Sequence, residues 1–202
     1  MKPRSDDEHN AKMKKVQAAH EKKLATKTVE KGLVIVHTGA GKGKTSAALG
    51  MVVRALGHGM KIGVVQFVKG AMATGEKAVF DRFPDQIEFK PMGEGFTWDT
   101  QDRARDVAVA RQGWEEVKRM IADPSYDMVV ADELNIILRY DYLPVAEVLE
   151  ALAAKPERTH VIVTGRNAPQ ALIDAADLVT EMTLVKHPFR EQNVKAQRGI
   201  EF

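Results

Sequence analysis

The sequence predicts an α/β protein in which a doubly wound, mainly parallel sheet carries helices on both faces. From Gly32 onward, short apolar runs alternate with longer amphipathic stretches, an order typical of parallel strands joined by crossover helices. The apolar runs are nearly continuous in Val and Ile, which indicates strands that are covered on both faces. A glycine-rich turn also separates the first run from the first amphipathic stretch.

Each expected element follows from one of these runs or stretches. The expected strands are residues 33–37, 62–68, 87–92, 128–131 and 160–164, with a more polar sixth at 178–185. The expected helices are residues 44–56, 75–83, 100–121, 144–153 and 169–175. No internal repeat, low-complexity tract or linker follows residue 32, so residues 32–202 are expected to form one domain.

Composition excludes several classes of protein. The chain has 202 residues, with 44% hydrophobic and 29% charged residues, which is typical of a globular protein and not of a disordered or fibrous one. The absence of cysteine excludes a disulfide scaffold, thiolate chemistry and Cys-ligated zinc, and it suits a reducing compartment.

Residues 1–31 are expected to form a basic N-terminal arm that is helical when docked. They hold nine Lys and Arg against five Asp and Glu, and they contain few large apolar side chains. Met13, Val16, His20 and Leu24 fall at helical spacing and make a thin stripe. A helix that frays in solution is equally compatible with this pattern.

Charge and hydropathy indicate a cytoplasmic protein that partners neither nucleic acid nor membrane. Residues 32–202 carry 21 Lys and Arg against 23 Asp and Glu, which is not a nucleic-acid footprint. Apolar runs such as residues 33–36 fall far short of the roughly 18–20 residues that a membrane span needs. The N-terminus lacks the apolar core of a signal peptide, and Asp6, Asp7 and Glu8 argue against a transit peptide.

The strongest motif is a phosphate-binding loop at residues 38–45, Thr-Gly-Ala-Gly-Lys-Gly-Lys-Thr, between an expected strand and an expected helix. Its glycines let successive backbone N–H groups face one anion, and the helix N-terminus adds partial positive charge. Lys44 is placed to reach the terminal phosphates and the Thr45 hydroxyl to ligate Mg²⁺. The loop therefore predicts a P-loop NTPase (RecA-like) sheet, although Thr38 stands where the general motif has glycine.

The second motif is an apolar strand that ends in two carboxylates, Asp132 and Glu133. In phosphate-loop proteins such an acid lies near Mg²⁺, and a second acid can orient a ligand or water. Adjacent carboxylates at this position are otherwise commonly a helix cap. Gln66 ends another strand on the same expected edge and could contact nucleotide or a second substrate.

The rest of the chain resembles the corrinoid (ATP:cob(I)alamin) adenosyltransferases of the phosphate-loop type, from about Gly32 to Phe202. The blocks that carry the resemblance are residues 39–45 (GAGKGKT), 54–59 (RALGHG), 64–70 (VVQFVKG), 95–100 (GFTWDT), 132–134 (DEL), 140–144 (YDYLP), 164–166 (TGR), 185–189 (VKHPF) and 195–197 (KAQ). Their combination and order are highly specific.

The resemblance implies transfer of the 5′-deoxyadenosyl group of ATP to the Co(I) of a reduced corrinoid, cobalamin or a precursor such as cobinamide, with triphosphate leaving. It implies Mg²⁺ or Mn²⁺ as cofactor, a flavoprotein reductant and a homodimer. Lys44, Thr45 and Glu133 are expected to be catalytic, and the expected metal ligands are Thr45, Asp132 and Glu133. Contact with the corrin is expected from Phe96 and Trp98. The residues expected to bind ATP are Thr38, Gly39, Ala40, Gly41, Lys42, Gly43, Lys44, Thr45, Ser46, Arg54 and Arg166.

The chain departs from the family pattern at Ala40, where the family has asparagine. A side-chain amide is thereby lost, but the amide-lined loop stays intact, so a small effect on ATP affinity is expected. Two other functions remain open on the motifs alone. One is a P-loop ATPase acting on a macromolecular partner, which would release orthophosphate without corrinoid. The other is a nucleoside or nucleotide kinase, which usually carries an Arg-rich lid that is not evident here.

Overall fold

The computed structural model describes residues 6–68, 75–92 and 102–201. The chain divides into two compact units, Met1–Lys31 and Gly32–Phe202.

The first unit contains helix α1, Asp6–Leu24, in which no residue is buried. Acidic residues occupy its first turn and basic residues its last turn, an arrangement that favours the helix dipole at both ends. The stripe expected at helical spacing is therefore on a helix, but its apolar members Met13, Val16 and Leu24 are exposed by 42%, 52% and 55%.

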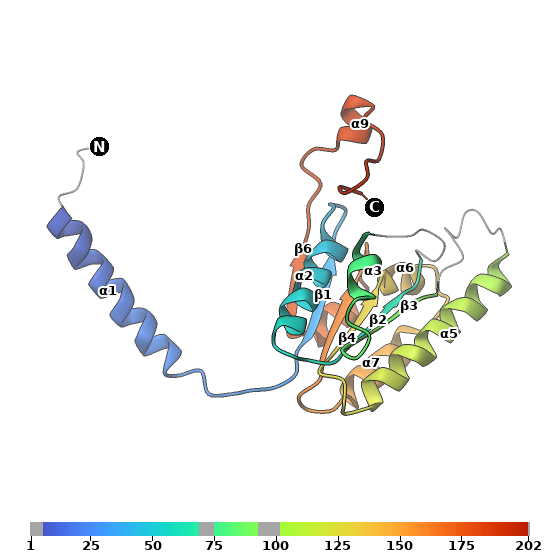
Figure 1. Ribbon diagram of the computed structural model, residues 1–202, viewed down its shortest axis with the longest axis horizontal. Coiled ribbons are helices and arrows are strands. Elements are labelled where there is room, and N and C mark those ends of the chain that lie inside the picture. The colour runs from blue at the N-terminus through green and yellow to red at the C-terminus, as the bar shows by residue number, and fades with distance from the viewer. Residues whose placement is uncertain (1–5, 69–74, 93–101, 202) are drawn as a thin grey trace. The chain divides into compact units, whose positions relative to one another are not determined.

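The second unit is built on a six-stranded sheet of order β3-β2-β4-β5-β1-β6 (Figure 1). Every pair of neighbouring strands is parallel, so the predicted doubly wound, mainly parallel sheet is confirmed. The strands are β1 (Val34–Thr38), β2 (Ile62–Gln66), β3 (Ile87–Pro91), β4 (Met128–Asp132), β5 (His160–Thr164) and β6 (Leu178–Glu181).

Helices cover both faces of this sheet. On one face α2 (Lys44–Gly57) and α3 (Gly75–Phe80) pack on a cluster that includes Ile35 of β1. The other face is covered by α5 (Arg103–Ala122), α6 (Leu134–Arg139), α7 (Val145–Ala153) and α8 (Gln170–Ala175). A short helix, α9 (Pro188–Gln192), follows β6.

Two periodicities in the sequence create these layers. In β1, Val34 and Val36 belong to one apolar cluster and Ile35 to the other, because successive strand residues point to opposite faces. In α5, the buried residues recur every three to four positions, so one stripe of the helix meets the sheet.

Several element bounds differ from those expected from the sequence. The sixth strand ends at Glu181 instead of residue 185, because its partner strand β1 ends at Thr38, the residue paired with Glu181. The Met182 carbonyl then accepts from the Gly41 N–H of the phosphate loop. Strand β2 ends at Gln66, and α3 ends at Phe80. Helix α5 begins at Arg103, after Asp102 caps it by accepting from the Arg105 N–H at 3.1 Å.

Two short helices, α6 and α9, were not expected. In α6 four of the six residues are buried, so the segment is apolar without an amphipathic period. Helix α9 has only five residues, which is too short to show a period at all.

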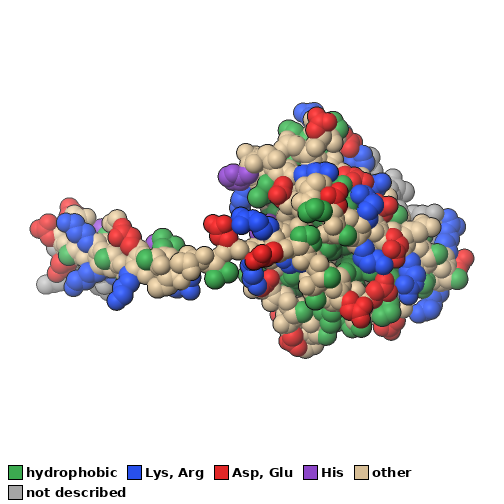
Figure 2. Space-filling model, turned by 90° about the horizontal axis from the view of Figure 1, so that it is seen from below, with side chains coloured by type: hydrophobic (Ala, Val, Ile, Leu, Met, Phe, Trp, Pro, Cys, Tyr) green, Lys and Arg blue, Asp and Glu red, His purple; other side chains and the backbone are tan. Residues whose placement is uncertain are grey.

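The surface carries mixed charge. Figure 2 shows Lys, Arg, Asp and Glu side chains interspersed over the face in view. Across the described residues, no helix combines the length and the apolar character needed to cross a bilayer.

Candidate functional site

The candidate site lies where β1, β4 and β5 end. These strands are neighbours in the sheet, and because they are parallel their carboxyl ends meet at one edge, where α/β proteins bind ligands. The phosphate loop follows β1, the acidic pair ends β4, and the turn with Arg166 follows β5.

The phosphate loop has a backbone that requires glycine. Gly39 and Gly43 have φ values of 96° and 102°, a left-handed region that other residues adopt at a cost. A Cβ on Gly39 would also lie 2.4 Å from the Met182 carbonyl oxygen. The motif glycines therefore serve both the turn and the close approach of a second segment.

That second segment is the chain after β6. The Gly41 N–H donates to the Met182 carbonyl at 2.6 Å, and the Met182 N–H donates to the Thr38 carbonyl at 2.9 Å. Lys42 forms an ion pair with Glu201. The C-terminal segment thus contacts the phosphate loop through two backbone hydrogen bonds and one ion pair. The sequence motif did not predict this contact.

Lys44 lies inside the loop and is only 6% exposed. Its ammonium donates to the Gly39 carbonyl at 2.8 Å and also to the Gly41 carbonyl. Burial lowers the pKa of Lys44; Glu133 opposes that shift, whereas Arg166 adds to it. Glu133 and Arg166 are therefore close enough to Lys44 for their charges to act on its ammonium group.

Asp132 is fully buried and accepts hydrogen bonds from three side chains. The Thr45 hydroxyl donates to its Oδ1 at 2.9 Å, so the two expected metal ligands are in direct contact. The Thr164 hydroxyl donates to the same oxygen at 2.6 Å, and Gln66 Nε2 donates to Oδ2 at 3.0 Å. Since carboxylate and hydroxyl oxygens are ligands that Mg²⁺ accepts, this pair fits a magnesium ion that keeps several waters.

Glu133 begins α6 in a left-handed conformation, with φ 65°. It occupies the N-cap position, but its side chain makes no capping hydrogen bond, so the helix-cap interpretation does not account for it. Its backbone N–H donates to the Thr164 hydroxyl at 2.9 Å. Its Oε2 lies 3.2 Å from the point that a Cβ on Gly165 would occupy, which places the carboxylate over the turn after β5.

Of the other expected nucleotide-binding residues, all but Arg54 lie at the edge of the sheet where the site is. Thr38 is buried and its hydroxyl accepts from the Ala168 N–H at 3.0 Å, so this side chain holds the loop after β5. Ala40, Ser46 and Arg166 are exposed at the same edge. Arg54 is not brought there: it lies in the last turn of α2, about 15 Å along the helix axis from Lys44 at 1.5 Å per residue.

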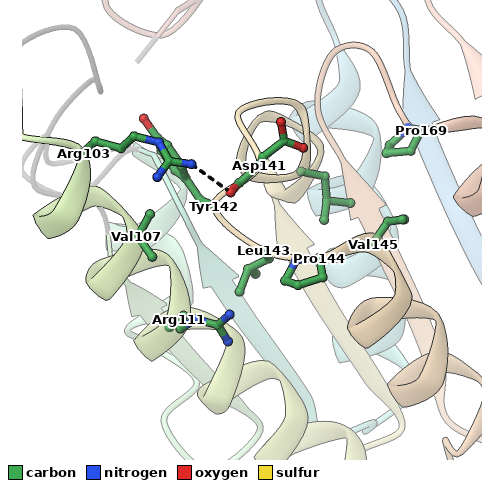
Figure 3. A pocket seen from close by; sticks show the side chains of 10 residues that line it. Arg103, Val107, Arg111, Asp141, Tyr142, Leu143, Pro144, Val145 and Pro169 are labelled. Carbon is green, nitrogen blue, oxygen red and sulfur yellow. Dashed lines mark hydrogen bonds between the residues drawn. The ribbon is translucent and has the colours of Figure 1, made fainter.

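Phe96 and Trp98, the expected corrin contacts, lie outside the described residues. The described chain resumes just before α5, whose first turns form one wall of a cavity of about 420 Å³ (Figure 3). Arg103 donates to the Asp141 carbonyl at 3.3 Å across this cavity, and its guanidinium lies 5.8 Å from the centre of the Tyr142 ring. Residues 141–144, part of one of the blocks that carry the resemblance, thus form the opposite wall.

Sequence reasoning missed the residues that support the acidic turn. Gln66 was noted only as a possible contact of nucleotide or a second substrate, and in the structure its Nε2 donates to Asp132. Thr164 and Asn135 were not singled out as site residues, although both are fully buried beside the acids. For Thr164 the only signal was its position at the end of a strand next to β4, which needs the strand order, whereas Asn135 lies in α6, a helix that was not expected.

Fold and site together define a phosphate-loop α/β protein, with a Lys and Thr after β1 and an acid at the end of β4, which β5 separates from β1 in the sheet. The chain matches the ATP:corrinoid adenosyltransferase BtuR/CobO/CobP family over residues 30–202. It is 57% identical to a corrinoid adenosyltransferase of a Sinorhizobium species, covering 98% of this chain and 94% of that one. A corrinoid adenosyltransferase of Pseudomonas aeruginosa is 52% identical, covering 99% of this chain and 98% of that one. One of Escherichia coli K12 is 46% identical, covering 98% of this chain and 100% of that one.

The chain therefore belongs to the ATP:corrinoid adenosyltransferase family. It is an enzyme whose substrates are ATP and a corrinoid, and the expected function is confirmed at this level. The alternative of an ATPase acting on a macromolecular partner finds no support in these similarities.

Proposed function

We propose that the buried corner formed by Lys44, Thr45 and Asp132 stabilises triphosphate as the leaving group of adenosyl transfer. The observation that supports this is the direct Thr45–Asp132 hydrogen bond of 2.9 Å, which joins the phosphate loop to the acidic strand. Lys44 adds a buried positive charge in the same loop.

The reaction has a simple balance of atoms and electrons. Co(I) of the reduced corrinoid attacks the 5′-carbon of the ribose, the carbon–oxygen bond breaks, and its electron pair leaves on the triphosphate. The nucleophile carries no proton, so no general base is needed. The task of the protein is to position the two substrates and to stabilise charge that develops on the leaving oxygen.

Loop residues divide this task among them. Lys44 turns from the Gly39 and Gly41 carbonyls, which it now contacts, toward the phosphates, and backbone N–H groups of residues 39–46 bind phosphate oxygens. Thr45 and Asp132, together with Glu133, would hold Mg²⁺ or Mn²⁺. When bound, this ion supplies additional charge stabilisation for the triphosphate. Arg166, exposed at the same edge, adds a further cation.

We assign the corrinoid to the side of the site where α5 begins. Phe96 and Trp98 would press on the lower face of the corrin, displace its axial ligand and make Co(II) easier to reduce. The cavity beginning at Arg103 supports this assignment, since Val107 and the Tyr142–Pro144 segment give it apolar walls.

The aromatic segment has a test of its own. Phe96→Ala and Trp98→Ala should lower the rate strongly when Co(II) corrinoid and a weak reductant are supplied. Chemically prepared Co(I) should restore most of the activity. Equal losses in the two assays would mean that the aromatics only bind or pack.

We also propose the partners that the family resemblance implies, together with the cytoplasmic location that the sequence predicts. A flavoprotein supplies the electron to Co(II), the active unit is a homodimer, and the enzyme works in the cytoplasm. The arm of residues 1–31 is a unit separate from the catalytic domain of residues 32–202, and it docks when substrates bind. Sedimentation with and without MgATP and corrinoid tests the dimer, and protease protection of α1 tests the docking.

The overall reaction is tested by anaerobic incubation of the protein with MgATP and cob(I)alamin. We expect a light-sensitive adenosylated product in the visible spectrum and one triphosphate per corrinoid. Orthophosphate released at the same rate without corrinoid would overturn the proposal.

A further inference from the structure

We infer that Thr164 is a positioning residue that orients both carboxylates of the site, Asp132 and Glu133. The inference rests on the proposed role of these acids in binding the metal of MgATP. Thr164 ends β5, and the register pairs Ala131 of β4 with Val163 of β5. The residues that follow this pair, Asp132 and Thr164, therefore end neighbouring strands side by side.

The direction of each hydrogen bond fixes what the Thr164 hydroxyl does. The Glu133 N–H can only donate, so Thr164 Oγ1 accepts from it at 2.9 Å. An ionised carboxylate can only accept, so the hydroxyl proton points to Asp132 Oδ1 at 2.6 Å. One hydroxyl thus sets the side chain of the first acid and the backbone from which the second acid projects.

A second hydrogen bond joins the turn after β5 to the acidic turn after β4. Asn135 Nδ2, one residue past the start of α6, donates to the Gly165 carbonyl at 3.0 Å. Thr164, Asp132 and Asn135 are each fully buried, so water does not compete for these bonds. The turn after β5 is therefore bound to the acidic turn after β4, and Glu133 keeps its left-handed conformation with its amide satisfied.

This arrangement makes Asp132 a preorganised ligand. Its Oδ1 accepts from Thr45 on one side and from Thr164 on the other, while Gln66 binds Oδ2. When Thr45 coordinates a metal, Thr164 still holds the carboxylate in place. Partners of metal ligands typically contribute about 10- to 100-fold in metal affinity or activity.

The test compares Thr164→Val, which keeps the shape but loses the hydroxyl, with Thr164→Ser, which keeps the hydroxyl. The full-length protein is used, and the readouts are Mn²⁺ binding with ATP by electron paramagnetic resonance, the Mg²⁺ concentration for half-maximal activity, and the urea unfolding midpoint. For the valine variant we expect metal affinity to fall about 10- to 100-fold, with ATP binding in the absence of metal little changed. The serine variant should stay within about threefold of the parent protein.

Thr159→Val is the matched control. Thr159 is also buried and precedes the same strand at its other end, where its hydroxyl donates to the Tyr126 carbonyl at 3.1 Å. It should lose stability without any change in metal affinity. An equal fall in metal affinity for both valine variants, or none for Thr164→Val, would overturn the inference.

Two further variants keep the result decisive. If Thr164→Val does not fold, Thr164→Ala carries the same expectation. Asp132→Asn separates this inference from the proposed function: loss of metal affinity there but not in Thr164→Val overturns the inference alone. If Asp132→Asn also binds metal normally, the proposed role of the acids fails.

Discussion

The phosphate loop after β1 and the acidic turn after β4 reach adjacent positions by opposite means. The loop is made by local sequence: its backbone needs Gly39 and Gly43, and Lys44 bonds to carbonyls within five residues of itself. The acidic turn is made by distant residues, because Asp132 is held by Gln66 and Thr164, which lie 66 and 32 positions away.

This difference shows where the two halves of the site are vulnerable. The loop depends on backbone conformation and on one buried charge, so glycine and lysine substitutions should damage it. The turn depends on side-chain hydrogen bonds to an ionised group, each worth about 1.5–3 kcal/mol. Each substitution in the acidic turn should therefore remove one such hydrogen bond, and it should lower metal affinity more than ATP binding.

The largest effect is expected from Lys44→Ala. Removing a charged donor to the leaving group should lower kcat by about 10²- to 10³-fold or more, measured with saturating MgATP and chemically prepared cob(I)alamin. Lys77→Ala, on α3 where the partly exposed Lys77 pairs with Asp81, is the control and should leave kcat unchanged. Activity within threefold of the parent protein in Lys44→Ala would remove the loop from the mechanism.

Two glycine variants test whether the phosphate loop needs glycine for its backbone conformation. Gly39 lies in the loop, and Gly50 in α2 is the control for replacing any glycine. Gly39→Ala adds a Cβ 2.4 Å from the Met182 carbonyl oxygen at a positive φ, so we expect loss of ATP binding and about 1–3 kcal/mol of stability. Gly50→Ala adds a Cβ with nothing within 4 Å, inside α2, and should raise stability by about 0.5–1 kcal/mol. Denaturant titration and ATP binding measure both, and similar behaviour of the two variants would contradict this account of the loop.

On the acidic side, Gln66→Leu should have a smaller effect than Thr164→Val. It removes one hydrogen bond from Asp132 Oδ2 but leaves both bonds at Oδ1. We expect the Mg²⁺ requirement to rise about tenfold, with the KM for ATP at saturating Mg²⁺ little changed. A rise in this KM without a change in the Mg²⁺ requirement would instead mean that Gln66 contacts the nucleotide.

The smallest expected effect is on the pH dependence of stability and concerns His37, the next-to-last residue of β1. It is buried, neither ring nitrogen has a hydrogen-bond partner, and burial lowers its pKa below the ordinary value of 6.5. As the pH falls through 6.5, the unfolded chain takes up a proton that the folded one does not, so the free energy of unfolding decreases.

His37→Leu should therefore flatten the fall in unfolding free energy between pH 7.5 and 5.5, measured by urea titration. His160, whose pKa is also lowered by burial, leaves part of the slope in place. His58→Leu, at the exposed end of α2, controls for loss of a histidine as such. An unchanged slope in His37→Leu would show that His37 does not contribute.

The sequence predicts features that depend on neighbouring residues better than features that depend on distant ones. The strand 33–37, the loop and the helix from Lys44 were predictable because each depends on neighbours in the chain. Asp132 was predictable from an apolar run that ends in acids. Thr164 and Asn135 were not, since their roles exist only once β4 and β5 are placed side by side. The Met182 contact was missed for a related reason: a close approach of backbones leaves no pattern in the residues that make it.

The central claim is that the loop and the acidic turn act on one leaving group. A double-mutant cycle of Lys44→Ala and Asp132→Asn, scored by kcat with MgATP and cob(I)alamin, tests it most directly. Because both residues would stabilise the same triphosphate, the account predicts that the double variant loses less activity than the product of the single losses, with a coupling of about 1 kcal/mol or more. Single losses that multiply to the double loss would contradict the claim and make the two regions independent.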